Sequence, residues 1–320
     1  MGQTIITLGA LQKSATTYEK ELLIMPATSA SATLQHMNGM PGLKGNHTLG
    51  QLDGDVELAP YKRSRKADGS FTISPRELEI FLGNCAYDFD PNEVWGTIYG
   101  SLVAQGEALK NVDVNKYILM FVAAKLGKKL NMAIWNAKRN AEGNTTKDLF
   151  NGFDTITDTE ATAGNIAADK GNYVQLEETI TQANAIDVFN SIYDAASDEL
   201  KGQKVKIYCS KDLYTAYNRN YQLQHGSLPY NREFNKTFLE GSDNLWEFCP
   251  LVSKKGSKYI HIAPQNNMVY GYGAGENPGE HLAVGKYEPW ALTLEAAMAF
   301  GVQFRSISPE MLMVAKLKVE

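Results

Sequence analysis

A long apolar stripe in the middle of the chain constrains the fold more than any other feature of the sequence. Between residues 114 and 138, apolar side chains recur at the three- and four-residue spacing of a helix. Asp113 is placed to cap its start, and a helix of this length would span roughly 37 Å at about 1.5 Å per residue. We therefore predict one continuous helix over about 114–138 that acts as a strut. The stripe consists of Ile118, Phe121, Val122, Leu126, Leu130, Ala133 and Ile134.

The segment at 39–75 has the pattern of an extended β-hairpin. Glycines punctuate it, and the short apolar-polar alternations at 56–58 and 70–73 are typical of strands, with Asp68-Gly69 as a tight-turn dipeptide. The segment holds few large apolar residues, and a two-stranded hairpin without a covering layer is marginally stable in water. We expect it to lie on another surface, either of this chain or of a second copy.

Four basic residues lie between the two predicted strands, namely Lys62, Arg63, Arg65 and Lys66. A run of charge usually forms a solvated loop. The alternative is a contact with an acidic surface, either a neighbouring molecule or a phosphate backbone. We take the four residues as candidate inter-subunit contacts that would guide assembly.

The second half of the chain predicts helices that cover a sheet. Residues 143–172 are polar and rich in turn signals, so we expect an irregular, exposed connection there. An apolar face over about 184–200 predicts a helix, the alternation at 205–209 predicts a strand, and Ser210 is placed to cap a further helix. This order is typical of an α+β lobe. Later strands are predicted at 259–263, 267–270, 291–304 and 311–317.

Length and composition exclude several classes of protein. With 320 residues the chain exceeds what one hydrophobic core usually serves, so two packed lobes or one elaborated domain are expected. The 31 basic and 36 acidic residues give a formal net charge of -5, which argues against a sequence-reading nucleic-acid binder. Three scattered cysteines predict neither a disulfide framework nor a zinc site. No run of about 18 apolar residues occurs, so no membrane span is expected.

No motif in the sequence predicts catalysis. None of the five histidines stands at metal-ligand spacing from another, so we interpret them as ordinary surface or core residues. The glycine-rich stretch at 271–275 lacks the last glycine of a dinucleotide fingerprint, and Pro278 follows where a helix would be needed. We therefore expect no catalytic residue, no metal and no cofactor. A soluble α+β enzyme with a site assembled from scattered residues stays open as an alternative.

Four short stretches carry a resemblance to a known family. They are GSFTISPREL at 69–78, GNCAYDF at 83–89, MAIWN at 132–136 and IAPQNNMVYG at 262–271. In this order they are similar to the return strand of an extended loop, the start of a peripheral domain, the end of a spine helix and a strand pair of an axial domain. The chain thus resembles, over nearly its whole length, the major capsid protein of tailed bacteriophages or prophages of the Hong Kong 97 type.

The resemblance implies an α+β, Hong Kong 97-like capsid fold with a particular division of the chain. Residues 1–38 would form an N-terminal arm and 39–80 the extended β-hairpin loop. The peripheral domain would occupy 81–202 and contain the spine helix over about 114–138. An axial domain would follow at 203–285, and 286–320 would supply return strands to both domains.

The resemblance also implies a structural role. Subunits would self-assemble as pentamers and hexamers into an icosahedral head shell that encloses double-stranded phage DNA without sequence-specific binding. Scaffolding protein and portal are implied partners, with no membrane involved. The protein would be located in the virion after assembly in the host bacterial cytoplasm. An encapsulin-like nanocompartment shell is the alternative on the same fold. Some members of the family crosslink through a lysine of the extended loop, an activity that we do not carry over.

Overall fold

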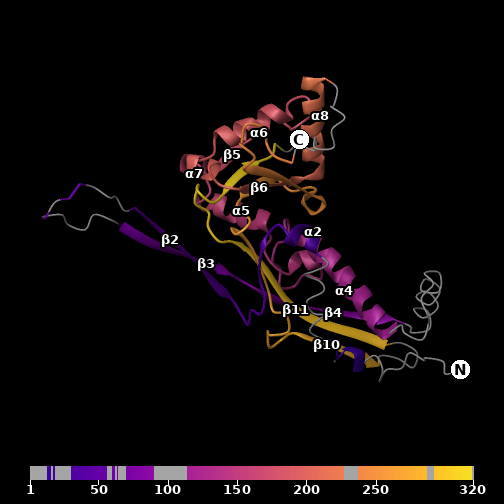
Figure 1. Ribbon diagram of the computed structural model, residues 1–320. Helices are drawn as coiled ribbons and strands as arrows, with labels where there is room; N and C mark the ends of the chain where they lie inside the picture. Colours follow the sequence, from indigo (N-terminus) through magenta and orange to yellow (C-terminus); the bar gives the residue numbers. More distant parts are fainter. Residues whose placement is uncertain are drawn as a thin grey trace.

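The computed structural model describes residues 13–15, 17–18, 30–55, 60–61, 63, 70–89, 114–226, 237–286 and 292–318. In this part of the chain, two five-stranded sheets stand one above the other, and a two-stranded hairpin extends away from both (Figure 1). No helix within the described ranges combines the length and the apolar composition that crossing a bilayer requires. The short elements are α2 (Ser31–Leu34) and the 3-10 turns η1 (Thr146–Asp148), η2 (Ala168–Lys170) and η4 (Val252–Lys254).

The lower sheet in Figure 1 is built around one long strand, β11 (Leu292–Phe304), which confirms the strand predicted over 291–304. The strands β9 (Met268–Tyr272) and β10 (His281–Lys286) pair with it in antiparallel fashion. The strand β1 (Asn38–Met40) extends the sheet by pairing parallel with β9. The whole of β4 (Phe81–Phe89) also runs antiparallel along β11.

The upper sheet has the strand order β5-β12-β8-β6-β7. Its outer pairs β5–β12 and β6–β7 are parallel, and the pairs of β8 with β12 and with β6 are antiparallel. The predicted strands at 205–209, 259–263 and 311–317 all lie in this sheet. Its members are β5 (Tyr173–Gln175), β12 (Met313–Lys316), β8 (Tyr259–Ala263), β6 (Val205–Ser210) and β7 (Trp246–Leu251).

Three helices cover the upper sheet: α6 (Ala185–Asp194), α7 (Asp198–Lys201) and α8 (Lys211–His225). The helix predicted over 184–200 is therefore two helices. The chain breaks between them because the Ser197 side chain accepts a hydrogen bond from the Leu200 N–H and starts a new helix. Ser210 caps α8 in the predicted way.

The upper sheet separates two hydrophobic cores, and its side chains alternate between them. In β6, Ile207 and Cys209 pack toward α6 and α8, while Tyr208 packs toward the lower sheet. The same alternation places Met313 and Val314 of β12 in opposite cores. This two-sided burial follows from the two-residue period of a strand and explains why these strands have few polar residues.

Helix α4 (Val114–Ala133) is continuous, but it ends five residues short of the predicted position 138. Its buried face includes Leu119, Ala123 and Leu130, each at most 6% exposed. Phe121, which we placed on the buried stripe, is 57% exposed. Apolar residues occur on more than one side of this helix, so their spacing indicated a helix without indicating which side would be buried.

The end of α4 meets the start of α5 (Phe153–Thr162) through direct backbone hydrogen bonds. Every helix leaves carbonyls without partners at its C-terminus and N–H groups without partners at its N-terminus. Here the N–H groups at the start of α5 donate to carbonyls of the turn at 134–137 that directly follows α4, and the opposed partial charges of the two helix ends attract. A side chain at Gly152 would overlap the Trp135 carbonyl, so this approach requires glycine. The bonds run from Gly152 to Ala137 at 2.8 Å, from Phe153 to Ile134 at 3.1 Å and from Asp154 to Trp135 at 2.9 Å.

The expected irregular connection over 143–172 is therefore wrong for its middle part. Phe150 and Phe153 are fully buried, and Ile156 is 9% exposed. These three apolar side chains are isolated among polar residues in the sequence, which concealed the helix. Packing against α4 and β11 supplies the burial that the local pattern did not reveal.

A buried charged network fills the space between α4, α5 and the upper sheet. Lys254 of η4 is 1% exposed, and its Nζ lies 3.6 Å from the centroid of the Trp135 ring. The same Nζ lies 3.7 Å from Asp154 Oδ1, which is an ion-pair distance rather than a hydrogen bond. Burial lowers the pKa of Lys254 to about 8 and raises the pKa of Asp154. Because an unpaired buried charge is costly, each member of this network depends on the others.

His261 of β8 completes the network in its neutral form. Its Nδ1 accepts a hydrogen bond from Lys254 Nζ at 2.8 Å. The Thr157 hydroxyl donates to the Phe153 carbonyl at 2.8 Å, so its oxygen accepts from His261 Nε2–H at 2.9 Å. Burial, with the positive charge of Lys254 beside it, holds the pKa of His261 well below its ordinary value. The hydrogen bonds thus assign one tautomer to this ring.

The predicted domain limits stay a prediction. Helix α6 shares one core with β6, β7 and β8, although it precedes the proposed start of the axial domain at residue 203. That packing favours an earlier boundary, between α5 and β5.

We predict that His261 makes the stability of the subunit depend on pH below 6.5. In that range the unfolded chain binds a proton at this histidine and the folded chain does not. Stability therefore falls as the pH falls, by up to about 1.4 kcal/mol per pH unit. Urea unfolding of the wild type between pH 7.5 and 5.5 should show this slope, and His261→Gln should lack it. His281→Gln, at an exposed histidine, is the control and should keep it. An equal slope in His261→Gln would contradict the assignment.

Candidate functional site

The projecting hairpin and its attachment to the body form the candidate functional site. The hairpin consists of β2 (His47–Asp55) and β3 (Ser70–Leu78), paired in antiparallel register from His47 opposite Leu78 to Asp55 opposite Ser70. Nine residues per strand extend roughly 30 Å at about 3.3 Å each. Figure 1 shows the ribbon leaving the body and pointing away from both sheets. An extended hairpin and the strand predicted at 70–73 are confirmed. The first strand lies at His47–Asp55, and the strand predicted at 56–58 and the Asp68-Gly69 turn are outside the described residues.

The base of the hairpin is buried. Leu49 and Leu78 are 4% and 0% exposed, and they pack against Ile80, Val269 and Ala299 beside the lower sheet. At the next residue, Gly50, a side chain would meet no other atom within 4 Å, and Figure 1 shows the ribbon continuing away from the body beyond this point. The hairpin is therefore attached at one end and has no covering layer within the described residues.

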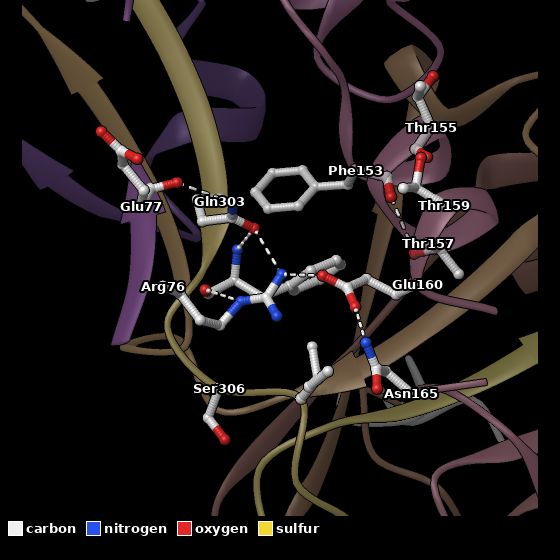
Figure 2. A network of polar contacts seen from close by, with 12 residues as sticks. Arg76, Glu77, Phe153, Thr155, Thr157, Thr159, Glu160, Asn165, Gln303 and Ser306 are labelled. Atoms are coloured by element: carbon white, nitrogen blue, oxygen red, sulfur yellow. Dashed lines mark hydrogen bonds and ion pairs between the residues drawn. The ribbon is translucent and has the colours of Figure 1, made fainter. Parts of the chain in front are cut away.

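Arg76 is the polar part of this attachment (Figure 2). Its Nη2 donates to Glu160 Oε1 at 2.7 Å and to Gln303 Oε1 at 3.1 Å. Its Nε donates to the Phe304 carbonyl at 3.2 Å. One guanidinium group thus joins β3 of the hairpin to α5 and to the end of β11. The planar fork of arginine suits this task because it offers several donors in fixed directions.

The partners of Arg76 are themselves held in place. Glu160 Oε2 accepts a hydrogen bond from Asn165 Nδ2 at 2.8 Å. Gln303 Nε2 donates to the Glu77 carbonyl at 3.0 Å, which ties the hairpin backbone directly to β11. The side chains of Arg76 and Glu160 are only 14% and 18% exposed, so solvent screens their ion pair weakly. Figure 2 shows these groups converging between the three elements.

The connection between β3 and β4 lies directly against β11. A side chain at Gly301 would overlap the carbonyl of Glu79. Glycine at this position therefore allows the hairpin base to approach the long strand closely enough for the Gln303 contact. The direction in which the hairpin leaves the body depends on this close approach together with the Arg76 contacts.

Of the four predicted contact residues, which fall between β2 and β3 in the sequence, the structure describes one. Arg63 is exposed. Lys62, Arg65 and Lys66 lie outside the described residues, so their role stays a prediction. The residues that attach the hairpin, Arg76, Glu160 and Gln303, were not predicted. Their positions in the sequence are up to 227 apart, and no local pattern relates them.

A cavity of about 410 Å³ lies between α4, the loop that follows it, and the face of β4 and β11. Leu126 and Phe300 line its apolar part, and Arg139 and Asn140 its polar part. Cys85 lies in its wall, but burial raises the pKa of this thiol, so it is not an activated nucleophile. Within the described ranges, no group of three or more histidine, cysteine or carboxylate side chains is arranged to hold a metal ion.

Comparisons of sequence find no match. No protein-family model matches the chain, and no curated protein matches it at a significant level.

Comparison of structures finds many similar chains. A chain of the satellite phage P4 procapsid including size determination (Sid) protein has a TM-score of 0.59 at 12% identity, over 92% of this chain and 90% of that one. The capsid of a native GTA particle has a TM-score of 0.58 at 11% identity, over 90% and 91%. The capsid of cyanophage A-1(L) has a TM-score of 0.54 at 13% identity, over 91% and 93%. The predicted Hong Kong 97-like α+β fold is confirmed.

We predict that Arg76 and Glu160 stabilise the folded subunit jointly. In a double-mutant cycle of Arg76→Ala and Glu160→Ala, we expect a coupling energy of about 1 to 3 kcal/mol, because the ion pair is charge-assisted and partly buried. Urea unfolding of the four proteins measures it. Hydrogen exchange of the β3 amides should become faster in Arg76→Ala.

The matched control is the pair Lys201 and Asp198, which lie 3.6 Å apart with the aspartate almost fully exposed. The same cycle there should give a coupling energy near zero, since surface ion pairs contribute little. Equal coupling at the two pairs would show that Arg76 does not anchor the hairpin.

Proposed function

We propose that this chain is a major capsid protein, a structural subunit that self-assembles into the icosahedral head shell of a tailed phage or prophage. The observation that carries the proposal is the likeness to capsid chains over about nine-tenths of both partners, with the projecting hairpin in place. Low sequence identity does not weaken the fold comparison, since this fold is set by the arrangement of its strands and helices rather than by a motif.

The geometry of the hairpin supports assembly in physical terms. A ribbon attached only at its base leaves its backbone edges and outer side chains without packing partners inside the subunit. A neighbouring copy supplies such a surface. Contacts between unlike surfaces of identical subunits close into rings when the rotation between them closes, and rings of five and six build a shell. Many modest contacts per subunit then give a stable container.

The proposal implies several partners and a location. A scaffolding protein would guide curvature, a portal would occupy one vertex, and double-stranded DNA would be enclosed without sequence-specific binding. Assembly would take place in the cytoplasm of the host bacterium, and the mature protein would reside in the virion. No catalytic role is part of the proposal.

The first experiment is sedimentation velocity with negative-stain microscopy of the purified chain, alone and coexpressed with the scaffolding gene product. We expect large species and closed shells or rings, because the hairpin needs a neighbour. The material that copurifies distinguishes a phage head from a nanocompartment. Packaging components would support the phage head, and a single enclosed enzyme would support the nanocompartment. A subunit that stays monomeric with scaffold and at high concentration would contradict the proposal.

A second experiment tests the basic cluster at the hairpin tip. We propose that Lys62, Arg63, Arg65 and Lys66 dock on an adjacent, mildly acidic subunit. Changing all four to Gln should leave the subunit folded, since exposed charges contribute little to stability. Assembly followed by light scattering should become slower, and its dependence on salt should weaken, because ionic screening acts over about 8 Å at physiological ionic strength.

The control variant loses the same number of positive charges at exposed lysines outside the hairpin. Lys170, Lys204, Lys211 and Lys255 are exposed around the upper sheet, and their change to Gln should leave assembly and its salt response nearly unchanged. If the hairpin variant assembles as fast as the wild type across the salt series, the cluster is an ordinary solvated loop.

A further inference from the structure

Helix α4 and its continuation carry a concentration of positive charge. Residues 114–141 hold six of the chain's 31 lysines and arginines and none of its 36 acidic residues. The rest of the chain is therefore more acidic than its overall charge suggests, with 25 basic against 36 acidic residues. The basic residues of the segment are Lys116, Lys125, Lys128, Lys129, Lys138 and Arg139.

Three of these lysines lie together on the outer side of α4. Lys125, Lys128 and Lys129 are exposed, and their spacing of three and four residues places them on one face of the helix. The opposite face packs against the body through Leu119, Ala123 and other apolar residues. Figure 1 shows α4 running along β4 and β11 of the lower sheet, and its C-terminal end contacts η4 beside the upper sheet. We call Lys125, Lys128 and Lys129 the α4 lysine face.

The charge of this face is not neutralised within the described part of the chain. None of the ion pairs found among the described residues involves Lys125, Lys128 or Lys129. Among the described residues, the charge-related contact of the three is that of Lys125 Nζ, which lies 5.1 Å from the centroid of the exposed Phe121 ring. Like charges this close repel one another, so the face gains stability when an anionic partner approaches.

We propose that the α4 lysine face binds the phosphate backbone of double-stranded DNA and forms part of the inner wall of the shell. The inference rests on the proposed function, which supplies the enclosed DNA. It also assigns an orientation to the subunit in the shell, in which the side that carries α4 faces inward. Binding is independent of base sequence, because lysine heads reach phosphates as point charges and no element here is shaped to enter a groove.

The chemistry of the face favours a polyanion over a second protein copy. Lysine is strongly hydrated and is depleted from the cores of protein interfaces. Among the described side chains of α4, the exposed large apolar residues are Phe121 and Met132. They are about 16 Å apart along the axis at 1.5 Å per residue, too far to form one apolar core. Duplex DNA carries a charge about every 1.7 Å of its axis, so the lysines need no particular register with it.

An acidic segment of a second copy is the competing occupant. Residues 171–200 hold six acidic residues and no basic one, which gives the chain a surface of opposite sign. That contact would need dehydration of lysine heads against a shaped surface, and the α4 lysine face offers no such shape. The acidic residues are Glu177, Glu178, Asp187, Asp194, Asp198 and Glu199.

The experiment uses the unassembled full-length chain and two unrelated 30-base-pair duplexes in fluorescence anisotropy titrations between 50 and 200 mM KCl. The wild type should bind both duplexes equally. The triple variant Lys125→Gln, Lys128→Gln, Lys129→Gln should bind at least tenfold more weakly at 50 mM. Its slope of log affinity against log salt should be smaller by about 3, since each phosphate contact contributes about 0.9. Thermal unfolding should be unchanged because the three side chains are exposed.

The matched control is Lys204→Gln, Lys211→Gln, Lys255→Gln, with the same change in charge on exposed lysines around the upper sheet. It should bind DNA within about twofold of the wild type. If DNA affinity falls equally in the two triple variants, the inference is wrong, because the loss would then depend on net charge and not on the position of the lysines. An unchanged salt slope in the α4 variant would overturn it as well.

An assembly assay with the α4 triple variant distinguishes a failure of this inference from a failure of the proposed function on which it rests. Shells formed by the α4 variant as readily as by the wild type are the expected result under microscopy. If that variant instead binds DNA normally and fails to assemble, the face is a contact between copies and the inference is wrong. If the wild type forms no shell under any condition, the proposed function fails, while the DNA titrations still report on the α4 lysine face itself.

Discussion

The structure depends on the contact between the C-terminal end of α4 and the N-terminal end of α5. Carbonyls of the turn that follows α4 accept hydrogen bonds from the first N–H groups of α5, so polar groups that would be costly to bury satisfy each other. Gly152 makes this possible because any larger residue would collide with the Trp135 carbonyl. A helix junction of this kind can sit inside the core instead of at the surface.

Once the junction is set, α5 connects the other parts of the molecule. Phe153 and Ile156 fill the core between the sheets. Asp154 and Thr157 face Lys254 and His261 beneath the upper sheet. One turn farther along, Glu160 reaches the hairpin through Arg76 (Figure 2). A displacement of α5 would therefore change its contacts with the upper sheet and with the base of the hairpin at the same time.

The two charged networks around α5 differ in a way that suits their positions. The Lys254 network is closed to water, so burial dominates the pKa of its members and the histidine stays neutral. The Arg76 network is partly exposed and joins elements through donors in fixed directions. The first holds two layers together, and the second orients a ribbon that has little packing of its own. The exposed lysines of α4 belong to neither network.

Periodicity in the sequence was sufficient for the long helix and the late strands, because each buries one face or two over many residues and so imposes a repeat on the chain, whereas the hairpin was predicted from short alternations and turn residues. Helix α5 was not predicted, since its buried apolar residues, Phe153 and Ile156, are few and stand among threonines and acids. The same limit applies to the site. The basic residues at the hairpin tip could be proposed from local charge, but the contact of Arg76 with Glu160 and Gln303 joins positions far apart in the chain. No local pattern records such a contact; only the packing of α5 and β11 against the hairpin base brings the three side chains together.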